Sequence, residues 1–307
     1  MQPEQQDIYG NIISVEFRKF FNEKFANSLK QNEKKRILYI VFLVLVSVFN
    51  TIMLFLIFQC LLFAPINAIK LTCFLVLFLL GIYSICYIVK SYKNKMKSFV
   101  MNKLLSFIGD FKINKINKRD LESIHTLKLF NGLDFPAVKN YITGKYGLLK
   151  IEIVEAQNKK SEFSKIPIFK GVLIKVPCIK KIKNYTIIKR KDSITFIDLD
   201  NKINIDDSEF EKYYDVYSDD KVEARWLLTA SFKNRMVQLA NHEIGKDITI
   251  SFENNNLYIA IDENKDWLDI SILKSATDIS NYRAVVLEII SILKIIDSLK
   301  LEQNIGL

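Results

Sequence analysis

The chain has 307 residues, of which 50% are hydrophobic and 25% charged, with only 9 Gly and 5 Pro. This composition excludes a disordered or low-complexity protein, and 4 Cys in a chain of this length exclude a disulfide-stapled scaffold. The formal net charge of +10 belongs to residues 1–119, which carry 17 Lys/Arg against 6 Asp/Glu, whereas residues 120–307 carry 27 against 28. The large C-terminal part is therefore neutral as a whole, and no nucleic-acid partner is predicted.

Two apolar runs come early in the chain. Residues 37–64 and 71–89 contain no charged side chain, and about 20 apolar residues suffice to cross a ~30 Å hydrocarbon core. We expect two transmembrane helices, at about 37–62 and 71–89 within the region 37–89. A cleaved signal peptide is disfavoured because 36 mostly polar residues come first. Asn50, Thr51 and Gln59 in the first run either hydrogen-bond to the second helix or belong to a polar pathway or an oligomer contact.

Basic residues flank both runs on the same side. Residues 18–36 contain seven Lys/Arg and residues 90–119 contain nine, but the connecting turn contains only Lys70. Since basic residues stay on the cytoplasmic side, both termini are predicted to be cytoplasmic. The prevalence of Lys, Ile and Asn suggests a bacterial source, and hence a multi-pass protein of the inner (plasma) membrane.

Segments on either side of the hairpin read as helices. Residues 1–36 form a cytoplasmic N-terminal segment with an amphipathic helix at 12–36, which either lies in the membrane interface or packs on the soluble domain. Residues 90–119 are expected to form a helical stalk with an apolar face at Met101, Leu104 and Ile108.

The remaining residues, 120–307, are expected to form a cytoplasmic α+β domain. Alternating β-branched segments predict strands at 147–154, 169–176, 185–189, 194–199, 203–205, 248–252 and 257–261. Helices are expected at 120–130, 209–212, 222–241 and 281–300. The predicted fold class is thus a transmembrane helical hairpin followed by a mainly antiparallel sheet with packed helices.

A series of short motifs resembles a known family. The motifs are Tyr141-Ile142-Thr143-Gly144, Ile153-Val154-Glu155-Ala156, Ile168–Val172, Ser208–Ser218 and Ala224–Thr229, followed by the hairpin 248–261. In this order they are similar to the bacterial membrane proteins grouped as domain of unknown function 3137. The resemblance implies an integral membrane protein with a cytoplasmic domain, and it supplies no catalytic residues.

Two groups of residues are candidate binding sites. The densest aromatic and basic group comprises Tyr213, Tyr214, Tyr217, Arg225 and Trp226, which either pack a helix on the sheet or bind a protein partner. The second group lies in residues 139–191, which carry 14 Lys/Arg against 3 acids, whereas residues 192–307 carry 12 against 22. Its lysines either contact anionic lipid or are neutralised by the acidic part of the domain. They are Lys165, Lys170, Lys175, Lys180, Lys181 and Lys183.

Motifs for catalysis are not recognisable. His125 and His242 have no Cys or His at metal-binding spacing, and no phosphate- or dinucleotide-binding loop is present. Asp198, Asp200, Asp206 and Asp207 lack the Gly-containing spacing of a calcium loop. No cofactor or metal is therefore predicted. The preferred function is a membrane-tethered interaction or scaffold module for a protein partner or an anionic lipid surface. The alternative is a membrane-anchored, hydrolase-like enzyme whose site, for instance around Cys178, has no recognisable motif.

Overall fold

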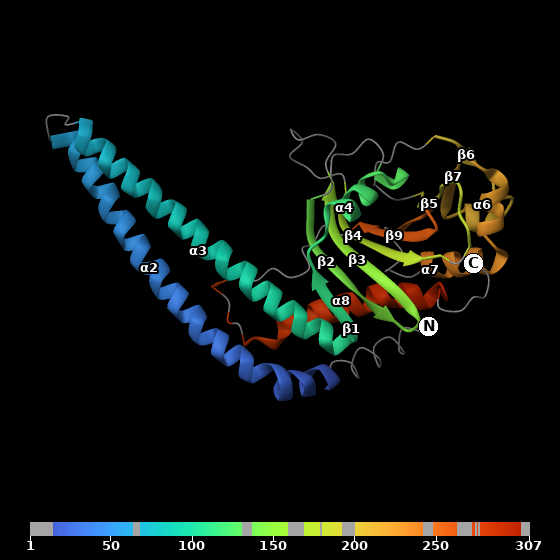
Figure 1. The fold of residues 1–307 in the computed structure, drawn as a ribbon, viewed down its shortest axis with the longest axis horizontal. Helices are drawn as coiled ribbons and strands as arrows, with labels where there is room; N and C mark the ends of the chain where they lie inside the picture. Colours follow the sequence, from blue (N-terminus) through green and yellow to red (C-terminus); the bar gives the residue numbers. More distant parts are fainter. Residues whose placement is uncertain are drawn as a thin grey trace. The chain divides into compact units, whose positions relative to one another are not determined.

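The computed structural model describes residues 15–63, 68–130, 137–158, 169–178, 180–191, 200–241, 248–262, 272–273, 275 and 277–301. Contacts divide the chain into two compact units (Figure 1). The helical unit comprises residues 1–107 and 268–284, and the sheet unit comprises residues 108–267 and 285–307.

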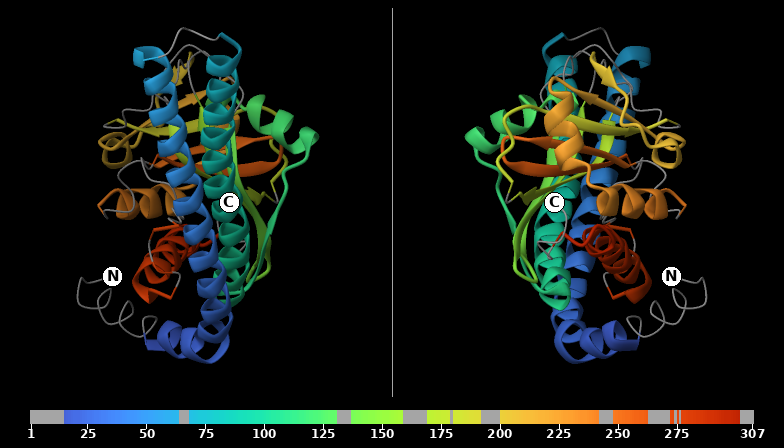
Figure 2. Two further views of the ribbon diagram at one scale, coloured as in Figure 1. Left: turned by 90° about the vertical axis from the view of Figure 1, so that its left-hand side faces the viewer. Right: turned by 90° about the vertical axis from the view of Figure 1, so that its right-hand side faces the viewer.

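Two long helices dominate the helical unit. The chain is helical from Val15, passes through a π-helical turn at Phe21–Phe25 and continues as α2 (Ala26–Phe63), and α3 follows at Ala68–Ile108. The two helices run side by side (Figures 1 and 2). Both are long and apolar enough to cross a membrane, and only 11% of the most apolar window of each is buried. This outward exposure of apolar side chains is compatible with membrane anchoring.

The polar residues of the first apolar run have different environments. Asn50 is 7% exposed and lies against Gly81 of α3, where a Cβ atom would overlap its amide group. Thr51 instead donates to the carbonyl of Ser47 in its own helix at 3.0 Å, and Gln59 is exposed. Of the three, Asn50 is thus the one buried against the second helix.

Aromatic rings hold the N-terminal helical segment in place. Phe17 lies 5.3 Å from Phe107 between ring centroids, and Phe25 lies 6.1 Å from Phe99 and 5.5 Å from Tyr282. Phe17 and Phe25 are almost completely buried. The amphipathic segment therefore packs on the polar end of α3 and on residue 282, within the helical unit.

The sheet unit contains nine described strands in one antiparallel sheet, ordered β1-β2-β3-β4-β9-β8-β5-β7-β6. The strands are β1 (Asp110–Asn114), β2 (Ala137–Tyr146), β3 (Leu149–Asn158), β4 (Phe169–Pro177), β5 (Thr186–Arg190), β6 (Lys202–Ile203), β7 (Tyr214–Ser218), β8 (Ile248–Glu253) and β9 (Asn256–Asp262). The α+β prediction, with a mainly antiparallel sheet after two long apolar helices, is confirmed.

Helices cover both faces of the sheet (Figure 1). They are α4 (Lys118–His125), the 3-10 turn η2 (Lys128–Phe130), α5 (Ser208–Glu211), α6 (Lys221–Leu227), α7 (Ala230–Ala240) and α8 (Ile279–Ser298). On one face, α4 and η2 join a buried cluster that includes Phe130, Phe169 and Leu173. On the other face, Phe232 of α7 packs edge-on against Phe252 of β8, with 5.6 Å between centroids. The first six residues of α8 belong to the helical unit and the rest to the sheet unit.

Two predicted helices differ from the structure. The expected helix at 90–119 ends at Ile108, and residues 110–114 form β1 instead. The expected helix at 222–241 is broken, because Leu228 has a non-helical backbone and Thr229 caps a new helix by accepting the N–H of Phe232. The sequence pattern predicts neither β2 nor β7. The predicted strand at 194–199 and residues 242–247, which include His242, lie outside the described residues.

Candidate interaction site

Tyr214 is a core residue. Its side chain is fully buried, its ring stacks on Phe210 at 5.3 Å, and its hydroxyl donates to the carbonyl of Met236 at 3.1 Å. This burial raises the pKa of Tyr214 to about 12. Of the two interpretations of the aromatic group, core packing is therefore the correct one for Tyr214.

The other two tyrosines are half-buried and have different neighbours. Tyr213 is half-buried, and the Nζ atom of Lys212 lies 5.6 Å from its ring centroid. Tyr217 is also half-buried but packs against the cluster under α4, on the face of the sheet opposite to Tyr214. Because side chains alternate along a strand, β7 places Tyr214 and Tyr217 on opposite faces of the sheet.

Trp226 and Arg225 lie on the outer side of α6. Trp226 is 50% exposed, and Val222, one helical turn earlier, is 78% exposed. The ammonium group of Lys180 lies 4.4 Å from the centroid of the Trp226 ring and 3.0 Å from the Trp226 carbonyl oxygen, to which it donates. Arg225 forms an ion pair with Asp206. We call Lys180, Val222, Arg225 and Trp226 the α6 patch.

Hydrogen bonds fix the loop before β5 onto α6. The Glu223 carboxylate accepts the backbone N–H groups of Lys183 and Asn184, each at 2.8 Å. Asn255, in the β8–β9 turn, accepts the N–H of Ile182 at 2.8 Å. Ala224 and Leu227, on the inner side of α6, are fully buried and anchor the helix. The structure thus brings one of the predicted lipid-contact lysines, Lys180, to the predicted aromatic site.

The remaining predicted lipid-contact lysines that the structure describes lie on β4 and on the loop before β5. Lys175 of β4 forms an ion pair with Glu152 of β3 at 3.2 Å. Lys170 lies five residues earlier on the same strand, so its side chain leaves the opposite face of the sheet. Lys181 and Lys183 are exposed, and Lys165 lies outside the described residues. Among the described residues, Lys170 and Lys175 thus leave opposite faces of β4, whereas Lys181 and Lys183 lie on the loop that carries Lys180.

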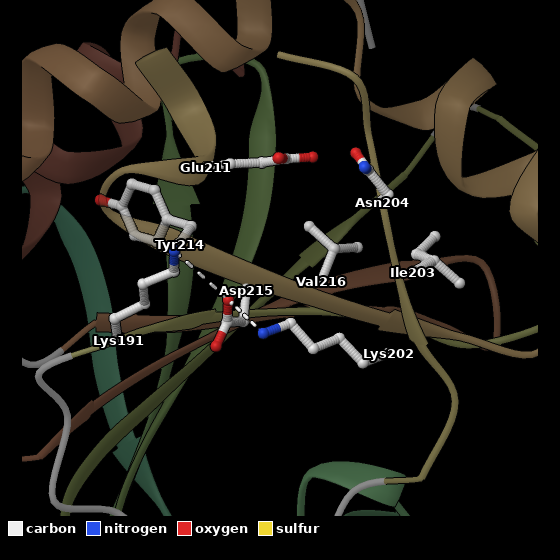
Figure 3. A pocket seen from close by; sticks show the side chains of 8 residues that line it. All are labelled: Lys191, Lys202, Ile203, Asn204, Glu211, Tyr214, Asp215 and Val216. Atoms are coloured by element: carbon white, nitrogen blue, oxygen red, sulfur yellow. Dashed lines mark ion pairs between the residues drawn. The ribbon is translucent and has the colours of Figure 1, made fainter. Parts of the chain in front are cut away.

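A polar pocket of about 330 Å³ opens beside β6 and β7 (Figure 3). It is lined by Lys191, Lys202, Ile203, Asn204, Glu211, Tyr214, Asp215 and Val216. Asp215 lies 2.9 Å from the Lys202 ammonium and 3.8 Å from that of Lys191. These residues come from three short segments between residues 191 and 216 and form no motif, so the pairing of β7 with β5 and β6 is needed to reveal the pocket.

Two of the acidic residues singled out in the sequence, Asp206 and Asp207, make structural contacts. Asp207 caps α5 by accepting the N–H of Phe210, and it pairs with Lys233 at 2.6 Å. Asp206 pairs with Arg225. Within the described ranges, no group of three His, Cys, Asp or Glu side chains is arranged to hold a metal ion. Asp198 lies outside the described residues.

The fold defines a class of protein in which two long apolar helices accompany an antiparallel α+β domain. Residues 167–301, from β4 to α8, match the family model described as "Protein of unknown function (DUF3137)". This match supports membership of that family and confirms the resemblance that the sequence motifs indicated.

Comparisons with curated proteins and with solved structures indicate no function. No curated protein matches the chain. A crystal structure of the mycobacterial trehalose monomycolate transport factor A, TtfA, is similar over 61% of this chain and 88% of that chain, at 12% sequence identity and a TM-score of 0.35. This similarity is too low to bear on function.

Proposed function

We propose that the protein is a membrane-anchored interaction module whose α6 patch binds a protein partner. The single observation that carries the proposal is the half-exposed Trp226, held in place by Lys180 beside the exposed Val222. The two apolar helices provide the anchor, and the basic flanks favour a cytoplasmic sheet unit with both termini on that side.

Trp226 has the properties of an interaction hot spot. Tryptophan and arginine are enriched at the energetic centres of protein interfaces, where a rim of other contacts excludes water. The hydrogen bonds from Lys183 and Asn184 to Glu223 fix the adjacent loop on α6, so little conformational entropy is lost when a partner binds. The apolar Val222 and Trp226 side chains, with Lys181, Lys183 and Lys221 exposed nearby, fit a partner surface with an apolar recess and an acidic border.

A protein partner fits the α6 patch better than an anionic lipid surface. Acidic residues are interspersed with the basic ones, namely Asp206, Asp219, Asp220 and Glu223. Attraction to an anionic bilayer depends on an excess of basic residues at the contact, and here Arg225 is already paired with Asp206. Contact of the α6 patch with lipid would therefore contradict the proposal. The enzyme alternative has no specific observation in its favour among the described residues.

Photo-crosslinking of the full-length chain in its native membrane tests this proposal. A photoreactive residue replaces Val222, and a matched control carries it at Leu148, which is 93% exposed in the β2–β3 turn. We expect one defined protein adduct from position 222, lost in a Trp226→Ala background and absent from position 148. The peptide crosslinked to position 222 should be apolar and adjacent to acidic residues.

Each other outcome contradicts the proposal. Adducts to lipid alone would support a membrane-contact surface, and adducts to a second copy of the chain would support self-association. Adducts that persist without the Trp226 ring would show that the ring is not the anchor. Because Trp226 is half-exposed, Trp226→Ala should leave the thermal unfolding temperature nearly unchanged, and a large drop would return Trp226 to a core-packing role.

A further inference from the structure

The two apolar runs meet their basic flanks at one common level of the helical unit. Tyr39 lies near the start of the first run and Tyr92 just beyond the second, and their ring centroids are 5.5 Å apart. Arg36, the last residue before the first run, donates to Glu33 and to the carbonyl of Ile272 at 2.8 Å. This level is where the proposed membrane anchor meets the lipid headgroups.

Five lysines lie close to this level, and we call them the juxtamembrane lysines. Two of them precede the first run on α2, and three follow the second run on α3. At a rise of about 1.5 Å per residue, their Cα atoms lie within about 9 Å of the apolar runs along the helix axes. That distance is comparable to a Debye length of roughly 8–10 Å. The five are Lys34, Lys35, Lys90, Lys93 and Lys95.

Acidic side chains of the same unit do not neutralise this group. Residues 90–108 contain five lysines and no Asp or Glu. Glu33, the acid nearest to the first run, is paired with Arg36 at 2.6 Å. The other acids among the described residues of this unit are Glu16 and Glu23, more than ten residues before the first run, and Asp278. Within the described residues, no carboxylate pairs with the four exposed ammonium groups, those of Lys34, Lys35, Lys90 and Lys95.

Tyrosine side chains mark the same level. Tyr87, three residues before Lys90, is 63% exposed, and Tyr39 is half-buried beside Tyr92. The opposite ends of the two runs, in residues 55–75, contain no Tyr or Trp. Tyrosine and tryptophan are enriched at the membrane–water interface. The aromatic and the basic side chains therefore both indicate headgroup contact at this one end of the hairpin.

We propose that the juxtamembrane lysines form a binding surface for anionic phospholipid headgroups and retain such lipids around the hairpin in preference to zwitterionic ones. Clusters of about 4–8 basic residues directly beside a transmembrane helix are typical of anionic-lipid binding. In a zwitterionic headgroup the lipid's own cation neutralises the phosphate, so the lysines gain less from it. The inference rests on the proposed membrane anchorage, is independent of the α6 patch, and differs from the orienting role of basic flanks, which needs no selectivity among lipids.

Spin-labelled lipids measure this selectivity directly. Full-length protein is reconstituted into phosphatidylcholine vesicles that contain a trace of spin-labelled phosphatidylglycerol or of spin-labelled phosphatidylcholine. Electron paramagnetic resonance separates lipids whose chains are restricted by the protein from those in the bulk bilayer. We expect the phosphatidylglycerol label to associate at least about threefold more strongly than the phosphatidylcholine label at low salt. The preference should fall towards equality at about 0.5 M salt, because salt screens the lysines.

A charge-neutralised variant locates the surface. Replacing four juxtamembrane lysines (Lys34→Gln, Lys35→Gln, Lys90→Gln and Lys95→Gln) should reduce the preference to less than about 1.5-fold. The matched control makes the same charge change at four exposed lysines of the sheet unit: Lys181→Gln, Lys183→Gln, Lys212→Gln and Lys221→Gln. The control should keep the preference of the wild type. All eight side chains are exposed, so neither variant should change the thermal unfolding temperature appreciably.

Four results would overturn the proposal. The first is equal association of the two labels with the wild type at low salt. The second is an equal loss of preference in both variants, which would indicate attraction to the charge of the whole protein. The third is a preference that persists in the juxtamembrane variant or at high salt. The fourth is the absence of restricted lipid with either label, which would also contradict the proposed anchorage. A missing adduct at position 222, by contrast, would contradict only the partner site.

Discussion

Asp207 performs two structural tasks with one carboxylate. Oδ1 accepts the N–H of Phe210 at 3.1 Å and so caps α5, while Oδ2 lies 2.6 Å from the Lys233 ammonium on α7. The hydrogen bond from Lys233, followed by that from the Phe210 backbone, lowers the pKa of Asp207. The carboxylate therefore joins the short helix to the long one that covers the sheet.

Neutralising Asp207 should destabilise the protein only where the carboxylate is ionised. Its folded pKa lies below the unfolded value of about 3.9, so its contribution is present above that value and is lost as the pH falls through the folded pKa. Asp207→Asn keeps a capping oxygen but loses the ion pair, and should lower the free energy of unfolding at pH 7 by less than about 1 kcal/mol. Urea unfolding of the full chain at pH 7 and at pH 3 measures this.

The difference between wild type and Asp207→Asn should shrink at pH 3. An equal difference at both pH values would show that the loss of the ionised carboxylate is not responsible. Lys212→Gln serves as a control because Lys212 is an exposed lysine that contacts the Tyr213 ring. It should show little change at either pH.

The sequence alone does not show that Tyr214 is buried and Trp226 is exposed. Both are aromatic residues in segments of mixed polarity, and a partner-binding aromatic has the same composition signal as a buried one. Burial of Tyr214 depends on β7, which has too few residues and too many polar ones (Tyr214-Asp215-Val216-Tyr217-Ser218) to predict a strand. Exposure of Trp226 depends on the helix break at Leu228 and Thr229, which the continuous apolar pattern conceals.

The helices and strands that the sequence predicts correctly are those with strong local sequence signals. The β8–β9 hairpin follows from alternating strands around Asn254 and Asn255, which both adopt positive φ angles (52° and 57°) as its turn requires. The apolar helices follow from length alone. The sequence does not predict β1, because its apolar residues Phe111 and Ile113 alternate over only five residues. The strand forms through its pairing with β2 in the tertiary fold.

The contact between α2 and α3 depends on the absence of a side chain at residue 81. A Cβ atom at Gly81 would overlap the Asn50 amide, which is buried and has no hydrogen-bond partner within the described residues. We expect Gly81→Ala to lower the thermal unfolding temperature of the full chain in detergent micelles, because overpacking typically costs about 1–3 kcal/mol.

A double-mutant cycle isolates this contact. Asn50→Ala removes the unsatisfied amide and should be nearly neutral, and the Asn50→Ala, Gly81→Ala double variant should recover most of the lost stability. Ser84→Ala is the control, because Ser84 donates to the carbonyl of Leu80 in its own helix. Additive effects of the two substitutions would mean that the helices are not held together at this point.

At the scale of the whole molecule, charge is arranged by segment. Two lysines of residues 139–191 pair with acids inside the sheet unit, Lys175 with Glu152 and Lys191 with Asp215. The N-terminal excess, by contrast, flanks two apolar helices. The basic residues of the N-terminal part are the ones expected to fix the orientation of the helices in a membrane.

This division predicts a topology with both termini in the cytoplasm and only the turn between the helices outside. Seven basic residues precede the first apolar run and nine follow the second, against Lys70 alone between them. The four native cysteines, Cys60, Cys73, Cys86 and Cys178, are replaced by Ala. Single cysteines are then introduced at Asn67 and at the exposed Leu148.

A membrane-impermeant maleimide should label intact cells at position 67 and should label position 148 only after the cells are permeabilised. The physical reason is that translocating either basic flank would carry many cationic side chains across the bilayer, whereas translocating the turn carries one. Labelling of position 148 in intact cells would reverse the orientation and remove the cytoplasmic setting that the proposed partner site requires. Labelling of neither position before permeabilisation, with both reactive afterwards, would mean that the hairpin does not cross the membrane.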